Sequence, residues 1–286
     1  MHIAVIIPAA GQSRRFNSAS AKGSKLTAEI GRKAVLVRAA ELFAGRPQVR
    51  QIIVAADPDE LETFKFRWAD KLSLMGATIV AGGRTERWET VLKALASVEP
   101  EVTHVAVHDA ARPVANPAMI DRLFDAAQRH KAVIPAVPVH STLKRVRTTE
   151  IKAPADPLDA LLAPGGPSPA TLHQVVETVP RDQLWMVQTP QIFDLELLRR
   201  AYEQITSGRL DAGSIASITD DSMLVERLGE EVVVVEGDPM NIKITVPDDL
   251  KFAEAVLAMR AGQPAAGDPL GPKRKHPTWA QMDDEA

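Results

Sequence analysis

Short apolar runs of strand length alternate with longer segments of helical period along most of this 286-residue chain. The alternation predicts crossover units on a mainly parallel sheet, because parallel strands need a long returning connection, usually a helix. The predicted strands are Ile3–Pro8, Gln51–Ala55, Thr78–Val80, His104–His108, Ala132–Val137 and Val232–Glu236. The predicted helices are Lys33–Ala44, Asp59–Lys71, Glu86–Ser97, Pro117–Gln128, Leu195–Ser207 and Ser222–Leu228. We therefore expect an α/β, Rossmann-like fold of three layers with an open, mostly parallel sheet.

The alternation fails between Val139 and Val179, where Ser, Thr, Pro and Gly accumulate. A stretch this long without a core pattern is either a protruding functional element or a mobile insertion. From Gly262 onward the chain carries four prolines and few apolar residues, which indicates a disordered tail. We expect one domain over residues 1–260, with residues 139–180 protruding from it, followed by a disordered tail over 261–286.

Charge and cysteine content exclude several classes of partner and chemistry. A net charge of −3 gives no electrostatic reason to expect nucleic acid or an acidic membrane surface as a partner. Any anionic ligand must then be held by a local cluster of cations. The absence of cysteine excludes disulfides, thiolate zinc sites and a thiol nucleophile, and leaves a reducing cytoplasm as the expected compartment. The apolar N-terminus is too short for a membrane span, so we expect no membrane association.

The segment after the first predicted strand, Pro8–Phe16, has the composition of a phosphate-binding turn. Small residues at Ala9, Ala10 and Gly11 let a ligand approach the backbone, and two arginines follow. In open parallel sheets, ligands bind beyond the carboxyl ends of the strands, so a nucleoside triphosphate would fit here. The segment is neither a P-loop nor a dinucleotide fingerprint, because it lacks the Gly-Lys-Ser/Thr and the second and third glycines. The alternative is a tight turn with arginines facing solvent.

Six further groups of residues follow this turn along the chain. They are Lys25, Gly82-Gly83 with Arg87, Val107-His108-Asp109-Ala110-Ala111-Arg112-Pro113, Thr189-Pro190-Gln191, Thr219-Asp220-Asp221 and Asn241-Ile242-Lys243. In this order they resemble the 2-C-methyl-D-erythritol 4-phosphate cytidylyltransferase family, from about Ile3 to Leu257 except near Ile151–Thr171. The resemblance implies a fold of the nucleotide-diphospho-sugar transferase type, with a β-arm over residues 139–180.

The resemblance also implies a reaction, in the non-mevalonate route to isoprenoid precursors. A phosphate oxygen of the sugar-alcohol phosphate attacks the α-phosphorus of CTP, and pyrophosphate leaves. Because two anions must meet, such catalysis depends on charge neutralisation and alignment. The matching positions are Arg15 and Lys25 for the pentavalent transition state, and Lys243 with Arg181 for the acceptor phosphate.

The family's binding residues map onto further positions of this chain. CTP would contact Ala9, Ala10, Gly11, Gly83, Thr90 and Asp109, with Asp109 also holding Mg²⁺ or another divalent cation. The acceptor would contact Arg112, Thr142, Arg181, Asp220 and Lys243. Thr142 and Arg181 belong to the arm, which in the family reaches the neighbouring subunit, so the resemblance implies a homodimer. A phosphate nucleophile is already ionised and needs no base, so we interpret His108 as structural.

Several positions depart from the family pattern. Ser13 replaces a common glycine, and Thr90 replaces the usual serine. The segment before Lys25 is long, which makes Lys22 a rival for its role, and the spacing from Gly83 to Arg87 is one residue longer than typical. Three alternatives stay open: transfer to ribitol 5-phosphate, a CTP-binding homologue without turnover, and a nicotinamide-dependent reductase. The reductase would use Asp57 on a ribose, but it would need the missing glycines.

Overall fold

The computed structural model describes residues 1–11, 16, 24–149 and 172–262. The chain groups into two compact units, of which the first comprises residues 1–117 together with the segment from 240 onward, and the second residues 118–239. The expectation of one domain over residues 1–260 stays a prediction. The expected insertion near Ile151–Thr171 lies outside the described residues, as does the expected tail apart from Ala261 and Gly262.

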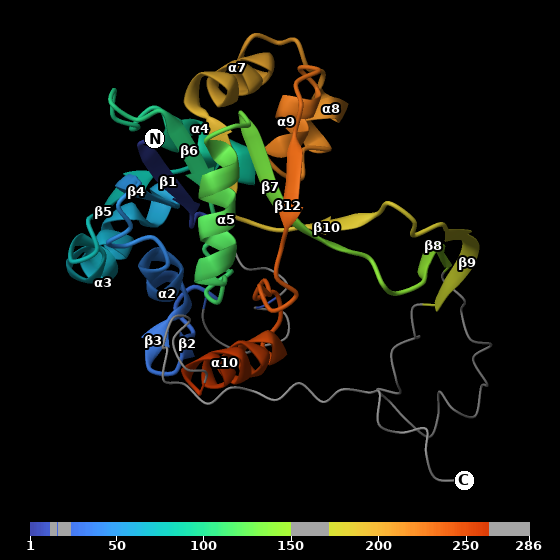
Figure 1. Cartoon of the computed structure of the whole chain (residues 1–286), viewed down its shortest axis with the longest axis horizontal. Coiled ribbons are helices and arrows are strands. Elements are labelled where there is room, and N and C mark those ends of the chain that lie inside the picture. Colours follow the sequence, from blue (N-terminus) through green and yellow to red (C-terminus); the bar gives the residue numbers. More distant parts are fainter. Residues whose placement is uncertain (12–15, 17–23, 150–171, 263–286) are drawn as a thin grey trace, which may run out of the picture. The chain divides into compact units, whose positions relative to one another are not determined.

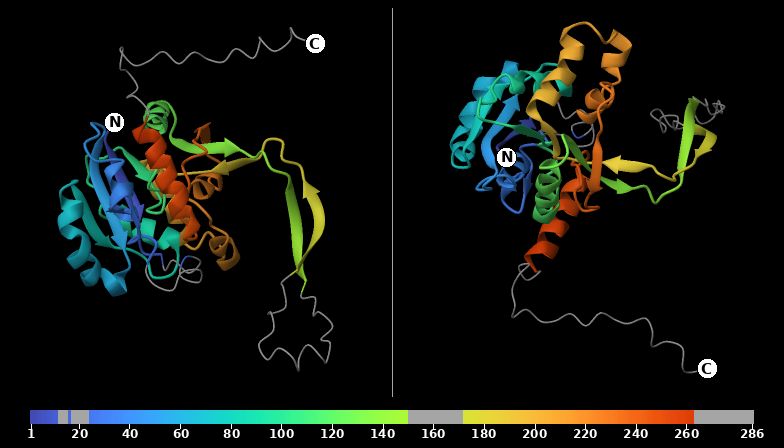
Figure 2. Two further views of the ribbon diagram at one scale, coloured as in Figure 1. Left: turned by 90° about the horizontal axis from the view of Figure 1, so that it is seen from below. Right: turned by 45° about the horizontal axis from the view of Figure 1, so that its top comes forward.

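The main sheet of the first unit is built from four strands that are all parallel. They are β1 (Ile3–Pro8), β4 (Val49–Ala56), β5 (Ala77–Ala81) and β6 (His104–Val107), in the order β5-β4-β1-β6 (Figures 1 and 2). Strand β1 has a neighbour on each side, so Ile6 lies beside both Ile53 and Val107. Every residue of Ile3–Ile7 is fully buried, which explains its uniformly apolar composition.

The crossover helices cover both faces of this sheet. Helix α2 (Val35–Glu41) connects β1 towards β4, and α3 (Leu61–Ser73), preceded by the short 3₁₀ helix η1 (Pro58–Glu60), connects β4 to β5. Helix α4 (Arg87–Leu95) leads from β5 back across to β6 and packs on β1 and β4. Because crossovers are right-handed, the reversal of direction puts α4 on the face opposite to α2 and α3. The strand order therefore reverses between β1 and β6, the point where such sheets bind ligands.

The second unit is built around β7 (Ala132–Pro138). Strand β12 (Val233–Glu236) pairs with β7 in parallel, whereas β10 (Trp185–Val187) and β11 (Gln191–Asp194) pair with it antiparallel. Its helices are α5 (Pro117–Ala127, which begins at the last residue of the first unit), α7 (Leu195–Thr206), α8 (Ala212–Ala216) and α9 (Ser222–Glu226). Among the described residues of this unit, the amphipathic helix α7 buries the largest side chain, Tyr202.

Two further strands of the second unit form the arm. Strands β8 (Leu143–Thr149) and β9 (Leu172–Val179) pair antiparallel with each other in a sheet of their own. In Figures 1 and 2 this hairpin stands away from β7 and β12. Three of its valines, Val146, Val175 and Val176, are about half exposed, so the hairpin has no core of its own. The predicted protruding β-arm is confirmed, and with it the Rossmann-like α/β fold.

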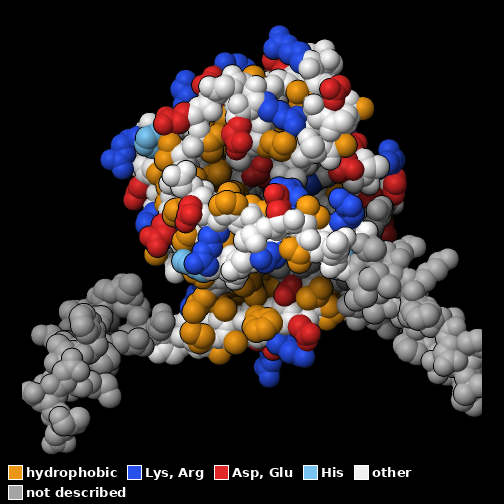
Figure 3. Space-filling view, turned by 90° about the vertical axis from the view of Figure 1, so that its right-hand side faces the viewer, with side chains coloured by type: hydrophobic (Ala, Val, Ile, Leu, Met, Phe, Trp, Pro, Cys, Tyr) orange, Lys and Arg blue, Asp and Glu red, His pale blue; other side chains and the backbone are white. Residues whose placement is uncertain are grey.

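All six predicted strands and all six predicted helices are confirmed, with small shifts at their ends. The first helix begins at Val35 and not at Lys33, because Lys33–Ala34 is strand β3, which pairs with β2 (Glu29–Ile30) in a short hairpin. The sequence analysis missed α10 (Asp248–Ala261). Two large apolar residues of α10, Phe252 and Met259, face solvent, and Figure 3 shows hydrophobic side chains at its lower end, the level of α10 in Figure 1.

Within the described part of the chain, every helix is too short or too polar to cross a membrane.

Candidate functional site

A cavity lies beyond the carboxyl ends of β1 and β6, at the reversal of strand order. Its volume is about 150 Å³, and residues that line it include Ala10, Gly11, Lys25, Gly83, Asp109 and Lys243. A second hollow of about 700 Å³ shares the walls formed by Ala10, Gly11 and Leu26. Its other walls include residues before α3, such as Asp57, and side chains of α3 such as Phe64 and Trp68. Together the two hollows have the volume of a nucleotide site.

The carboxylate of Asp109 lies at the centre of a cluster of cations. Its Oδ1 is 3.1 Å from Nε of Arg87, the first residue of α4. Its Oδ2 is 2.8 Å from Nζ of Lys243 and 3.6 Å from Nε of Arg112. The Asp109 side chain is 10% exposed and that of Lys243 is 39% exposed. Three cations around one carboxylate give this cluster a net positive charge, which favours an anionic ligand.

The electrostatics of this cluster keep Asp109 ionised. Burial raises the pKa of its carboxyl group, but the charges of Arg87, Lys243 and Arg112 outweigh burial and hold the pKa well below its usual range. Asp109 is therefore a carboxylate in the folded protein at neutral pH.

His108 is fully buried beside this cluster. Its Nε2 lies 3.0 Å from the backbone carbonyl of Arg112 and donates to it, and its ring meets Phe43 edge-on, with 5.0 Å between ring centroids. Burial lowers the pKa of His108 to about 4, so the imidazole is neutral. A neutral ring that closes the turn between residues 108 and 112 agrees with the expected structural role.

Backbone contacts bring Lys243 to Asp109 from a distant part of the chain. The amide of Ile244 donates to the carbonyl of Ala111 at 2.8 Å, and Nη1 of Arg112 donates to the carbonyl of Asn241 at 2.6 Å. These two bonds tie the segment 241–244 to the turn after β6. The position of Lys243 therefore depends on the turn that carries Asp109.

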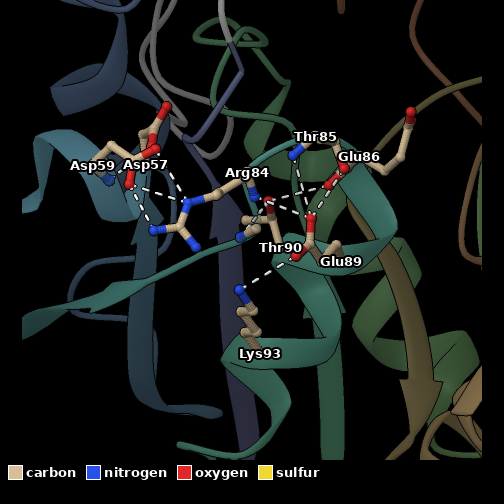
Figure 4. Close-up of polar contacts among 9 residues, drawn as sticks. Asp57, Asp59, Arg84, Thr85, Glu86, Glu89, Thr90 and Lys93 are labelled. Atoms are coloured by element: carbon tan, nitrogen blue, oxygen red, sulfur yellow. Dashed lines mark hydrogen bonds and ion pairs between the residues drawn. The ribbon is translucent and has the colours of Figure 1, made fainter.

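The opposite wall of the cavity is the loop between β5 and α4. The hydroxyl of Thr90 accepts from the amide of Gly83 at 3.1 Å and donates to the carbonyl of Glu86 at 3.4 Å (Figure 4). A Cβ on Gly82 would lie 2.7 Å from Cγ2 of Thr90, and one on Gly83 would lie 2.7 Å from Cβ of Glu89. Both positions need glycine because the backbone passes so close to α4.

Two charged side chains, Arg84 and Glu89, hold this loop in place. Nη2 and Nε of Arg84 lie 2.7 and 3.1 Å from Oδ1 of Asp59 in η1 (Figure 4). Oε2 of Glu89 accepts from the amides of Arg84 and Thr85 at 3.0 and 3.3 Å. Burial raises the pKa of the Glu89 carboxyl group. Hydrogen bonds from the amide of Thr85, from Lys93 and from the amide of Arg84 outweigh burial, so the pKa is lowered overall and the group is a carboxylate.

The structure brings most of the predicted nucleotide-binding residues and two predicted catalytic lysines together around the cavity. The residues concerned are Ala10, Gly11, Lys25, Gly83, Thr90, Asp109 and Lys243. Ala9 lines the neighbouring hollow, and Arg112 contacts Asp109. Arg15 lies outside the described residues, as do Ser13 and the rival Lys22.

The other predicted acceptor residues lie in the second unit. The guanidinium of Arg181 donates to the backbone carbonyl of His140, near the base of the arm, where Thr142 is exposed. The carboxylate of Asp220 accepts from Nε2 of Gln191 at 2.7 Å and from the hydroxyl of Ser222 at 2.9 Å. Their roles in binding stay predictions.

Arg87 received no predicted role, although it belongs to the motif that begins with Gly82-Gly83. The signal was available, because Arg87 follows a glycine-rich turn at the point where a strand gives way to a helix. Its partner Asp109, 22 residues away, could not be read from the spacing.

The residues around the cavity suit an anion better than a resident metal ion. Among the described residues, no three carboxylate or imidazole side chains converge as a metal site requires. The buried carboxylate that lines the cavity, Asp109, already faces three cations that would repel a divalent ion. The arrangement can bind a polyphosphate, and a metal ion would fit here only with phosphate oxygens beside it.

Comparison with known proteins agrees with this geometry. Residues 3–159 and 169–259 match the model of a family described as 2-C-methyl-D-erythritol 4-phosphate cytidylyltransferase. Proteins of that name from Halalkalibacterium halodurans and Symbiobacterium thermophilum are 34% and 37% identical, over 90% and 91% of this chain and 98% and 95% of theirs. The crystal structure of the Thermus thermophilus protein of that name is 30% identical with a TM-score of 0.63, covering 90% of this chain and all of that one. The Francisella tularensis protein is 28% identical with a TM-score of 0.67 and the same coverage.

Proposed function

The chain belongs to the 2-C-methyl-D-erythritol 4-phosphate cytidylyltransferase family, and we propose that the cations around Asp109 bind the phosphates during that family's reaction. The enzyme transfers a cytidylyl group from CTP to 2-C-methyl-D-erythritol 4-phosphate, releasing pyrophosphate, in isoprenoid precursor synthesis. The observation that most directly supports this site is the positively charged cluster around Asp109, which lies at the point between β1 and β6 where the strand order reverses. The family match removes support from the nicotinamide-dependent reductase.

The proposed mechanism needs alignment and charge neutralisation but no covalent intermediate. An oxygen of the acceptor phosphate forms a bond to the α-phosphorus of CTP while the bond from that phosphorus to the bridging oxygen of pyrophosphate breaks. Lys25 and Arg15 stabilise the negative charge at the α-phosphorus, and Lys243 with Arg112 positions the acceptor phosphate. No general base is required, which suits a neutral, fully buried His108.

Asp109 serves this mechanism by holding the cations before substrate arrives. Arg87, Arg112 and Lys243 would repel one another without an anion between them. The carboxylate keeps all three within 3.6 Å and still leaves positive charge for phosphates. Lys243 is the most exposed of the three, so it is the one that exchanges Asp109 for a substrate oxygen.

We propose that Mg²⁺ enters with CTP and is not held by the protein alone. The support is the donor set, because Asp109 offers one carboxylate and the nucleotide supplies further oxygens. When bound, Mg²⁺ would neutralise phosphate charge, and Asp109 is the side chain that would contact it. Every other contribution comes from the protein's own cations.

We also propose that two copies form a homodimer through the arm, with Thr142 and Arg181 completing the acceptor site of the partner subunit. The support is the exposed apolar surface of β9 and β10, where Val175, Trp185 and Met186 are about half exposed. Mixing Arg181→Ala with Lys243→Ala protein tests this arrangement. If the two residues act from different subunits, mixed dimers contain one intact site, and activity returns to about a quarter of wild type. No recovery after subunit exchange would show that both residues act from one subunit.

The acceptor and the compartment complete the proposal. Purified protein with CTP and either 2-C-methyl-D-erythritol 4-phosphate or ribitol 5-phosphate, assayed for pyrophosphate, tests the acceptor. We expect faster turnover of the methylerythritol phosphate, and equal or faster turnover of ribitol phosphate would contradict this. CTP binding without pyrophosphate release would indicate a homologue without turnover. We propose the cytoplasm as the compartment, supported by the absence of cysteine.

A further inference from the structure

The loop between β5 and α4 is oriented by the single carboxylate of Glu89. Oε2 of Glu89 accepts the amide of Arg84 at 3.0 Å, the amide of Thr85 at 3.3 Å and the hydroxyl of Thr85 at 3.3 Å (Figure 4). Its other oxygen, Oε1, lies 3.3 Å from Nζ of Lys93, one turn further along α4. One side chain therefore fixes two consecutive peptide groups of the loop.

Glu89 fixes these peptide groups from the side away from the cavity. Gly83, Arg84, Thr85 and Glu86 line the cavity, whereas Glu89 is not among its described lining residues. The carboxylate packs so closely behind the loop that a Cβ on Gly83 would lie 2.7 Å from Oε2. The loop thus lies between Glu89 and the space for the nucleotide.

The direction of the two amides sets the polarity of the cavity wall. In a trans peptide the N–H and C=O groups point in opposite directions, and the peptide bonds of this loop are trans. With the amides of Arg84 and Thr85 turned to Glu89, the carbonyls of Gly83 and Arg84 are directed to the opposite side, towards the cavity. Carbonyl oxygens accept hydrogen bonds and donate none, so the backbone of this stretch presents acceptors to the cavity.

We propose that Glu89 is a positioning residue that makes the site prefer an amino-bearing pyrimidine, a cytosine nucleotide over a uracil nucleotide. This inference rests on the proposed function, since it assigns the loop to the base of the nucleotide. Cytosine presents an amino donor at the position where uracil presents a carbonyl acceptor. A uracil carbonyl facing backbone carbonyls leaves both without a donor, which is strongly unfavourable in a buried site. Without Glu89, the peptide groups can turn and offer N–H groups to either base.

The test compares CTP and UTP in wild type, Glu89→Ala and Glu89→Gln. Equilibrium dissociation constants are measured by calorimetry and kcat/KM by pyrophosphate release. In Glu89→Ala we expect the preference for CTP over UTP to fall at least about tenfold, because hydrogen bonds to a charged acceptor are lost. Glu89→Gln keeps a carbonyl oxygen in place and should retain most of the preference. KM for CTP should rise while kcat changes less than about threefold, since no group at the α-phosphorus is altered.

Glu196→Ala is the matched control, since Glu196 is a carboxylate in the first turn of α7 whose Oε1 lies 2.8 Å from Nη1 of Arg199. It should leave both nucleotide affinities unchanged. An unchanged preference in Glu89→Ala, or equal losses for CTP and UTP, would overturn the proposal. If Glu89→Ala does not fold, Glu89→Asp replaces it: its shorter carboxylate should also lower the preference, and an unchanged preference would overturn the proposal. A wild type that binds CTP selectively without turnover would refute the proposed function and leave the role of Glu89 standing.

Discussion

Replacing Asp109 with asparagine removes the anion that holds three cations together. At an effective dielectric constant of about 20, each ion pair at these separations is worth ~5 kcal/mol before desolvation is subtracted. The three separations are 3.1 Å to Arg87, 2.8 Å to Lys243 and 3.6 Å to Arg112. Removing one partner from such a buried group destabilises a protein by ~3–5 kcal/mol, because the remaining charges are left without compensation. We expect Asp109→Asn to lower the thermal midpoint of unfolding by roughly 10 °C, measured by calorimetry at pH 7.

The dependence of this effect on pH has a definite sign. Because the pKa of Asp109 is depressed in the folded protein, its stabilisation is fully present above the unfolded pKa of ~3.9 and is lost as pH falls towards the folded value. The difference in unfolding free energy between wild type and Asp109→Asn should stay constant from pH 7 to about pH 5 and shrink below about pH 4. Asp248→Asn is the matched control, since Asp248 pairs with Lys251 at 2.9 Å on the exposed surface of α10.

The control variant should unfold like wild type. A thermal midpoint of Asp109→Asn within about 2 °C of wild type would refute the reasoning, because roughly 10 °C follows from the loss of a buried ion pair. A difference that does not shrink in acid would refute the assignment of the effect to the Asp109 carboxylate.

Three further predictions concern other groups of the site. Lys25→Ala should lower kcat by about 10²–10³-fold with the fold intact, as the loss of a preorganised donor does. Measuring kcat of both lysine variants tests this: a normal rate in Lys25→Ala together with a reduced rate in Lys22→Ala would assign the role to Lys22. Calorimetry should detect Mg²⁺ binding only when CTP is present, and binding to the protein alone would contradict the donor set described above. In the wild type, the free energy of unfolding should fall as pH decreases from about 6.5 to 4, because His108 has a pKa of about 4 when folded and takes up its proton at higher pH when unfolded. His108→Gln should make this fall less steep, and an unchanged slope in acid denaturation curves would contradict the prediction.

The strands that position the site could be predicted because burial on both faces leaves a strong signal. Ile3–Ile7 is uniformly apolar and fully buried, and a second buried apolar run ends at Val107, two residues before Asp109. Helix α10 gave no such signal, because apolar side chains lie on several of its sides: Ala253 is buried while Phe252 is 64% exposed. Strands β10 and β11 were missed because neither is a uniformly apolar, buried run: β10 is exposed, and β11 contains Gln191 and Asp194.

Contacts between residues far apart in the sequence could not be predicted from the sequence. Lys243 was recognised by resemblance, but its 2.8 Å contact with Asp109 depends on the bond between Ile244 and Ala111. The hydroxyl of Thr90 was expected to meet the base, and in the structure it joins Gly83 to Glu86. Such a role is invisible in a pattern, because it depends on how closely the backbone approaches the helix.

The same close approach explains how the loop tolerates an extra residue before Arg87. An added residue would normally leave amides of the loop without partners, and that costs free energy when they are buried. Here Glu89 accepts two of those amides and Thr90 a third, so the longer loop is held against α4 by three hydrogen bonds. Arg87 consequently still begins the helix at a point from which its guanidinium reaches Asp109. The two walls of the cavity are thus coupled through α4, and a change that loosens the loop should weaken phosphate binding as well as base selection.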